Sequence, residues 1–151
     1  MASAVAVLAL LGAGAALLWM TRPLPPGAHS SPVLAVRGAV RALATGDPGK
    51  VVDWVAPSEQ AAYLEGLQES RALGITGLKV TIHSFTVGRT TYPVATDQSR
   101  ALVAIQGSGE VCSTGGRTIC SPFPRGSPDG RASILTLREK GLWYIDASAD
   151  L

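Results

Sequence analysis

An apolar run near the start of the chain constrains everything that follows it. The run extends from Ala4 to Met20 and contains no charged residue. As a helix, these seventeen residues would rise about 25 Å, close to the ~30 Å hydrocarbon core of a bilayer. Trp19 lies near one end of the run, and indole rings favour the membrane interface. The sequence therefore predicts a transmembrane anchor within residues 1–21, which contacts the membrane through residues 4–20.

A cleaved secretory signal peptide is the alternative interpretation of this run. Signal peptides usually have a shorter apolar core with a basic flank before it. No Lys or Arg precedes this run, and the small-residue sequence Ala28-His29-Ser30 lies well beyond its end. These features favour an uncleaved anchor. The alternative is a secreted chain that begins at Ser31 after cleavage.

The rest of the chain divides into a linker and one domain. Residues 22–31 include three prolines and a glycine, a composition typical of a semi-stiff spacer. Residues 32–151 are numerous enough to form a single domain with its own core. Outside the linker, 12 Lys and Arg residues are balanced by 11 Asp and Glu residues. This balance gives no electrostatic footprint for nucleic acid, so no nucleic-acid partner is expected.

Three helices are predicted in the first half of the domain. Ser31-Pro32 has the pattern of an N-cap followed by proline in the first turn, and Gly46 ends the helix that follows. Asp47-Pro48 repeats the same start signal and begins a short second helix. Ser58 is the expected cap of a third helix, which Gly74 terminates.

The pattern changes to strands after Gly77. β-Branched residues alternate with polar ones, and Glu139–Gly141 has the character of a hairpin turn. Gly107 and Gly109 predict a bulge or a strong bend in the second strand. Residues 113–129 are expected to form a loop. The predicted strands cover residues 78–88, 99–112, 131–138 and 142–148. Helices followed by antiparallel strands indicate an α+β domain, with three N-terminal helices packed on a sheet of about four strands.

The two cysteines are Cys112 and Cys120, with seven residues between them. They lie at the end of one predicted strand and in the segment that returns from it, where antiparallel neighbours come within disulfide range. A zinc site would need two further ligands, and His29 and His83 lie in other parts of the chain. A redox dithiol usually has two intervening residues. The pattern therefore favours a structural disulfide over a metal or redox site.

This disulfide bears on the orientation of the anchor. Arg22 directly follows the apolar run, and by itself it would favour a cytoplasmic domain. Disulfides persist in oxidising compartments, however, and the cysteine pair outweighs a single arginine. We therefore expect a single-pass protein of the cell membrane with its C-terminal domain outside.

Two segments resemble the nuclear transport factor 2-like (cystatin-like) superfamily. The segment VRGAVRALATGDPGKVVDWVAPSEQAAYLEGL, residues 36–67, resembles its opening helices, and GLWYIDAS, residues 141–148, resembles its closing strand. The resemblance covers about residues 32–148 and implies a cone, in which a strongly curved antiparallel sheet wraps around the helices. Membrane-anchored extracytoplasmic versions occur in actinobacteria, including components of conjugation and secretion machines. The segment between Cys112 and Cys120 departs from the general pattern.

Enzymes of this superfamily, such as ketosteroid isomerase-like and polyketide cyclase-like members, place acidic or histidine residues inside the cone. The resemblance therefore implicates Asp53, His83 and Asp146. A general base needs a pKa raised by burial next to its substrate. His83 shares its alternation with Lys79 and Thr81, which predicts an outward position. The sequence thus predicts no catalytic residue, metal ligand or cofactor.

A small apolar ligand inside the cone is a further hypothesis. Trp54, Tyr63, His83 and Trp143 are the candidate pocket-lining residues, although aromatic side chains more often pack in the core. The sequence favours a non-enzymatic scaffold or interaction domain that binds a protein partner in the cell envelope. The alternatives are an apolar ligand-binding protein and an isomerase- or cyclase-like enzyme. A cone filled by side chains would favour a partner, whereas an open cavity with a buried ionisable group would favour binding or catalysis.

Overall fold

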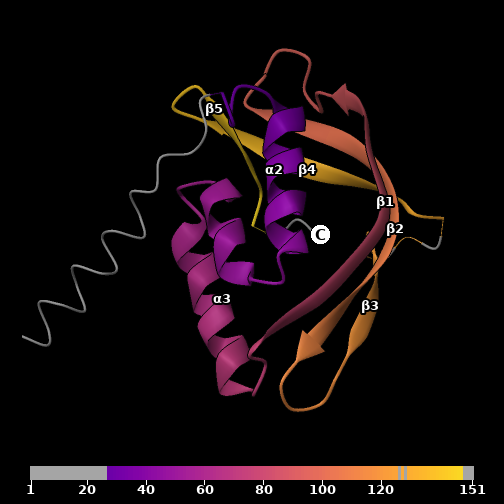
Figure 1. The fold of residues 1–151 in the computed structure, drawn as a ribbon. Coiled ribbons are helices and arrows are strands. Elements are labelled where there is room, and N and C mark those ends of the chain that lie inside the picture. Colours follow the sequence, from indigo (N-terminus) through magenta and orange to yellow (C-terminus); the bar gives the residue numbers. More distant parts are fainter. Residues whose placement is uncertain (1–26, 126, 128, 148–151) are drawn as a thin grey trace, which may run out of the picture.

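The chain folds into a curved antiparallel sheet that wraps around a helix (Figure 1). The structure is a computed structural model and describes residues 27–125, 127 and 129–147. The described part of the chain begins with three helices: α2 (Pro32–Ala44), the 3-10 helix η1 (Pro48–Trp54) and α3 (Gln60–Ala72). The strands are β1 (Gly77–Thr91), β2 (Arg100–Thr114), β3 (Cys120–Phe123), β4 (Arg131–Glu139) and β5 (Leu142–Ile145). The predicted α+β class is confirmed.

The predicted anchor and the first half of the predicted linker, residues 22–26, lie outside the described residues. Within the part of the chain that the structure describes, no helix is long and apolar enough to cross a membrane.

The first two helices begin at the caps that the sequence predicts. The Ser31 hydroxyl accepts a hydrogen bond from the Leu34 amide at 3.2 Å, and the Asp47 carboxylate accepts one from the Gly49 amide at 2.9 Å. These bonds satisfy amide groups that have no partner within the helix. Local polar side chains and the prolines that follow them therefore fix where α2 and η1 start.

The predicted cap of the third helix was wrong. Helix α3 begins after Glu59, whose side chain makes no capping hydrogen bond. Ser58 instead bonds the carboxylate of Glu139, a residue at the far end of the sequence. A long-range contact has replaced the local cap, so that Ser58 ties the start of α3 to the β4–β5 hairpin.

The sheet has the strand order β1-β2-β4-β5, and β3 pairs with the far end of β2. The long strand β2 pairs with β1 on one side. On its other side its first half pairs with β4, and residues 109–112 pair with β3. Strand β3 lies where the sequence predicts a loop, so the sheet of the described residues has five strands instead of about four. The four residues of β3, Cys-Ser-Pro-Phe, are too few to show strand periodicity, and the register with β2 holds them extended.

The β1–β2 ladder is irregular at the glycines of β2, as the sequence predicts, but the extra residue lies on β1 and not on β2. The β1–β2 register shifts between Ile82 and Ser84, so His83 is the inserted residue. A Cβ atom at Gly109 would lie 2.3 Å from the carbonyl oxygen of Thr81. Only glycine permits this close approach of β1 and β2, which allows the sheet to curve.

Helix α2 fills the concave side of the curved sheet (Figure 1). Its buried residues recur at helical spacing and face the inward side chains of β2, β4 and β5. Helices η1 and α3 form a second layer beside α2, and α3 has no fully buried residue. The main core contains Val36, Ala39, Val40, Leu43, Val51, Val55, Val103, Ile105, Phe123, Ile134 and Ile145.

Candidate functional site

The four predicted pocket residues lie on four different elements of the domain. His83 is exposed on β1, and Trp143 of β5 is 6% exposed in a small cluster with Ala35 and Ala101. Tyr63 of α3 is half-buried against the main core. The fourth residue, Trp54, lines a groove on the surface of the helical layer. Aromatic packing thus accounts for the positions of Tyr63 and Trp143.

The three candidate catalytic residues have different surroundings. Asp53 is partly exposed and lines the same surface groove as Trp54. His83 is exposed at the bulge of β1, in line with the outward position that its alternation predicts. Asp146 is partly buried just after β5, where its amide donates to the Leu135 carbonyl at 3.0 Å.

His29 belongs to the folded domain, although the sequence assigns it to the linker. It is 4% exposed, and its ring lies between Trp54 and Tyr144 at centroid distances of 4.8 and 4.3 Å. Its Nδ1 lies 2.5 Å from the Trp143 carbonyl oxygen, and the Trp143 amide donates to the His29 carbonyl at 2.9 Å. Because a carbonyl oxygen only accepts, Nδ1 carries the proton. These contacts attach the end of the predicted linker to β5.

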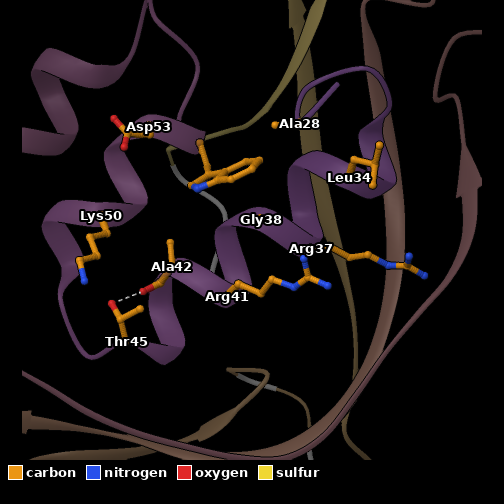
Figure 2. Close-up of a pocket in the computed structure, with 10 residues that line it drawn as sticks. Ala28, Leu34, Arg37, Gly38, Arg41, Ala42, Thr45, Lys50 and Asp53 are labelled. Carbon is orange, nitrogen blue, oxygen red and sulfur yellow. Dashed lines mark hydrogen bonds between the residues drawn. The ribbon is translucent and has the colours of Figure 1, made fainter. Parts of the chain in front are cut away.

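The groove beside Trp54 has a volume of about 470 Å³ and lies between α2 and η1 (Figure 2). Its wall is built by close packing of Trp54 on the backbone of α2. A Cβ atom at Gly38 would lie only 2.0 Å from the indole ring, so the ring lies flat on the helix where a side chain is absent. Leu34, which is 39% exposed, and Ala28 add apolar surface.

The charged lining of this groove is mostly basic. Arg37 and Arg41 are four residues apart and extend from the same side of α2, and Lys50 comes from η1 (Figure 2). None of the three is ion-paired with another residue of the described chain. Asp53 supplies the one lining carboxylate, and it has an interaction of its own. Like charges at this helical spacing disfavour a helix by about 0.2–0.5 kcal/mol, which a bound anion would offset.

Sequence reasoning did not find this groove. The signal that was available is the pair Arg37 and Arg41, which the periodicity of α2 places together on one face. Lys50 and Trp54 reach that face only because Gly46 ends α2 and η1 folds back along it. Chemically, the arrangement can hold an anion against an apolar wall.

The hydroxyl of Tyr63 secures η1 to α3 and donates to the Pro48 carbonyl at 2.9 Å. Burial, with a contribution from the negative charge of Asp47, raises the pKa of Tyr63 to about 12. The unfolded chain loses this proton near pH 10, before the folded chain does. The stabilising contribution is therefore complete below about pH 10 and is lost as the pH rises towards 12.

We accordingly expect Tyr63→Phe to remove part of the alkaline loss of stability. The urea midpoint of the natural chain should fall more steeply between pH 9.5 and 11.5 than that of the variant. Tyr92→Phe, at an exposed tyrosine, is the matched control and should keep the natural slope. Equal slopes for the natural chain and Tyr63→Phe would contradict the assignment.

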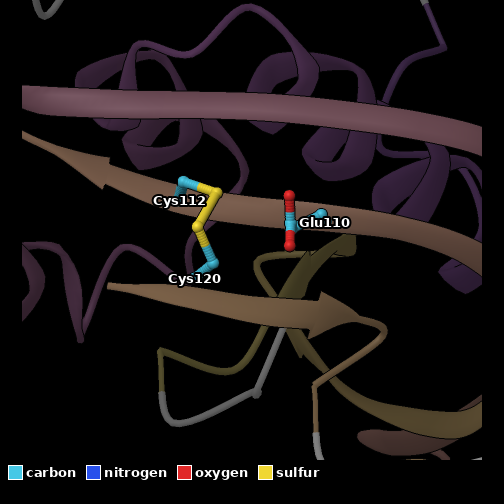
Figure 3. A group of neighbouring side chains, drawn as sticks. All are labelled: Glu110, Cys112 and Cys120. Atoms are coloured by element: carbon cyan, nitrogen blue, oxygen red, sulfur yellow. A yellow bond between two sulfur atoms is a disulfide. The ribbon is translucent and has the colours of Figure 1, made fainter. Parts of the chain in front are cut away.

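Cys112 and Cys120 face each other across β2 and β3 and form a disulfide (Figure 3). Glu110 lies beside them on β2, and the three side chains are close enough to hold an ion. Both sulfur atoms are used by the disulfide, however, so the group offers a carboxylate and no thiolate. The pair is thus a crosslink of the sheet, and it is typical of a protein from an oxidising, extracytoplasmic compartment.

Comparisons with known proteins add a structural likeness and no family. No protein-family pattern matches the sequence, and no curated protein matches it. Among solved structures, the chain is similar to the intermembrane-space region of the chloroplast protein ARC6, with 17% sequence identity and a TM-score of 0.47. The likeness covers 74% of this chain and 87% of that one.

Proposed function

We propose that this chain is a membrane-anchored, extracytoplasmic interaction domain of the nuclear transport factor 2-like type, without enzymatic activity. Its partner is a protein of the cell envelope, within an assembly such as a conjugation or secretion machine. The observation that carries the proposal is the filled concave face of the sheet. Val36 and Val40 of α2 are buried in the same core as Ile134 of β4. In enzymes of the superfamily that this chain resembles, the corresponding region inside the cone holds the substrate.

The filled core also favours a protein partner over an apolar ligand. An apolar ligand inside the cone would need a dry cavity between α2 and the sheet, and buried side chains occupy that space. The exposed surfaces of the domain are then the parts available for recognition.

The outer edge of β1 is the surface that fits a partner. This strand has 15 residues and pairs with β2, and no other strand of the described chain lies along its remaining edge. The start of that edge is occupied, because the Leu78 amide donates to the Gly46 carbonyl at 3.2 Å. Beyond it, the backbone groups before and after the inserted residue His83 can pair with an added strand.

The proposed location rests on two features, one within the domain and one that precedes it. The disulfide between Cys112 and Cys120 is typical of an oxidising compartment, and the apolar run Ala4–Met20 has the length and composition of a membrane anchor. Together they favour a domain held at the outer face of the cell membrane.

Site-specific photocrosslinking in the natural host tests the proposed partner. A photoreactive residue at His83, exposed in the middle of β1, should give a discrete adduct with an envelope protein. The same residue at Gln68, exposed on α3, is the matched control and should not give that adduct. The absence of an adduct from His83, or identical products from both positions, would contradict the proposal.

A further inference from the structure

We propose that the groove between α2 and η1 binds the phosphate group of an anionic lipid headgroup. Arg37, Arg41 and Lys50 would hold the phosphate, while Trp54 would contact the apolar part of the lipid. The choice of a lipid as the source of the phosphate rests on the membrane anchor of the proposed function. The phosphate chemistry itself rests on the groove alone.

The charges of the groove match a phosphate group in number and kind. Three cations and one carboxylate line it, which leaves an excess of two positive charges. A guanidinium can donate two parallel hydrogen bonds to phosphate oxygens, and a lysine ammonium adds a point charge from the opposite helix. Arg37, Arg41 and Lys50 are not ion-paired with other described residues, so an anion need not displace an existing partner.

The apolar wall distinguishes this groove from a general patch of surface arginines. The Trp54 indole is held against Gly38 on one side and stacks on the buried His29 ring at 4.8 Å, so its position is fixed before any ligand arrives. Leu34 and Ala28 extend the apolar surface beside it. A phosphate that is joined to a glycerol and acyl chain would use both halves of the lining, whereas a free phosphate would use the cations alone.

The position of the groove in the sequence also favours a lipid. Ala28 is part of the lining and follows Met20, the end of the apolar run, by eight residues. A fully extended chain of this length spans at most ~28 Å. A domain anchored by that run therefore carries the groove close to the headgroups, where lipids are concentrated.

Lipid binding by the full chain tests the groove, with native mass spectrometry as the readout. The full chain in detergent micelles is mixed with equal amounts of phosphatidylglycerol and phosphatidylcholine, and the bound lipid is identified. We expect phosphatidylglycerol to predominate, because the choline cation opposes the basic lining. The double variant Arg37→Gln/Lys50→Gln should bind phosphatidylglycerol about tenfold more weakly, since it removes two charge-assisted contacts.

The matched control is Arg117→Gln/Lys79→Gln, which removes one arginine and one lysine from exposed positions outside the groove. It should bind phosphatidylglycerol as the natural chain does, and both variants should keep the natural thermal midpoint. Arg41 is left unchanged because it lies in the last turn of α2, where a cation also stabilises the helix. Unchanged lipid binding by the groove variant would overturn the proposal.

Two further measurements separate the sources of phosphate and the role of the anchor. Inorganic phosphate at the same concentration should displace little lipid, and complete displacement would overturn the choice of a lipid. Vesicles of pure phosphatidylcholine should retain both the natural chain and the groove variant through the anchor. If the chain does not bind such vesicles but still prefers phosphatidylglycerol, the proposed membrane anchor is contradicted, whereas the proposed lipid site in the groove is not.

Discussion

Replacing Ile134 by Ala is expected to lower the free energy of unfolding by about 2–5 kcal/mol. Ile134 is 1% exposed and is among the largest fully buried side chains. It lies on β4 opposite Val103 of β2 and belongs to the same core cluster as Val36 of α2. The smaller side chain would remove apolar contacts and leave a cavity where the helix meets the sheet.

The same substitution at Ile119 is the matched control for this prediction. Ile119 lies between β2 and β3 and is 60% exposed, so Ile119→Ala should change stability by no more than about 0.5 kcal/mol. Urea unfolding followed by circular dichroism measures both variants. A loss below 1 kcal/mol for Ile134→Ala would contradict the packing of α2 in the concave face of the sheet.

The substitution Gly46→Ala should cost about 2–4 kcal/mol, because two penalties combine at this position. Gly46 follows α2 with a φ of +75°, a conformation that disfavours any side chain with a Cβ. A Cβ atom there would also lie 2.5 Å from the carbonyl oxygen of Leu78. Backbone cannot move away as a flexible side chain can, so the contact between α2 and β1 would have to open.

Gly74→Ala separates the two penalties. Gly74 also has a positive φ, of +88°, but a Cβ atom there would have no neighbour within 4 Å. We therefore expect it to cost about 1–2 kcal/mol, from the backbone conformation alone. Thermal or urea unfolding of both variants gives the comparison. Equal losses would show that the close contact between Gly46 and Leu78 does not exist in solution.

Local signals in the sequence predicted most of the elements. The caps at Ser31 and Asp47 act through bonds to residues only a few positions away, so they can be read from the sequence. The hairpin at Glu139–Gly141 is equally local, with Lys140 and Gly141 at φ values of +50° and +84°. Alternation likewise predicted the exposed position of His83.

Contacts between distant parts of the chain account for what the sequence did not reveal. Ser58 bonds Glu139 and not the start of α3, and His29 is buried by aromatic residues from η1 and β5. Neither contact can be predicted from neighbouring residues in the sequence, because each one forms only when the curved sheet is in place. The short strand β3 is held by its pairing with β2. In the sequence, the cysteine pair indicates this pairing at one position, where Cys120 lies opposite Cys112.

The candidate site divides in the same way. The sequence placed Arg37 and Arg41 on one face of a helix, which is half of the basic groove. The side of the groove that Lys50 and Trp54 form depends on η1 folding back so that Trp54 lies on Gly38. The identities of these two residues do not predict that contact. Conversely, Tyr63 and Trp143 were candidate pocket residues because of their type alone, and packing explains both.

The most direct test of the central claim is labelling of intact host cells with an amine-reactive biotin reagent that cannot cross the membrane. Lys50, Lys79 and Lys140 are exposed in the folded domain and would react wherever the reagent reaches them. A domain anchored at the outer face of the cell membrane should be labelled as fully in intact cells as in lysed cells, and the labelled chain should sediment with the membrane. Labelling that requires lysis, or a labelled chain recovered only from the medium, would contradict the account.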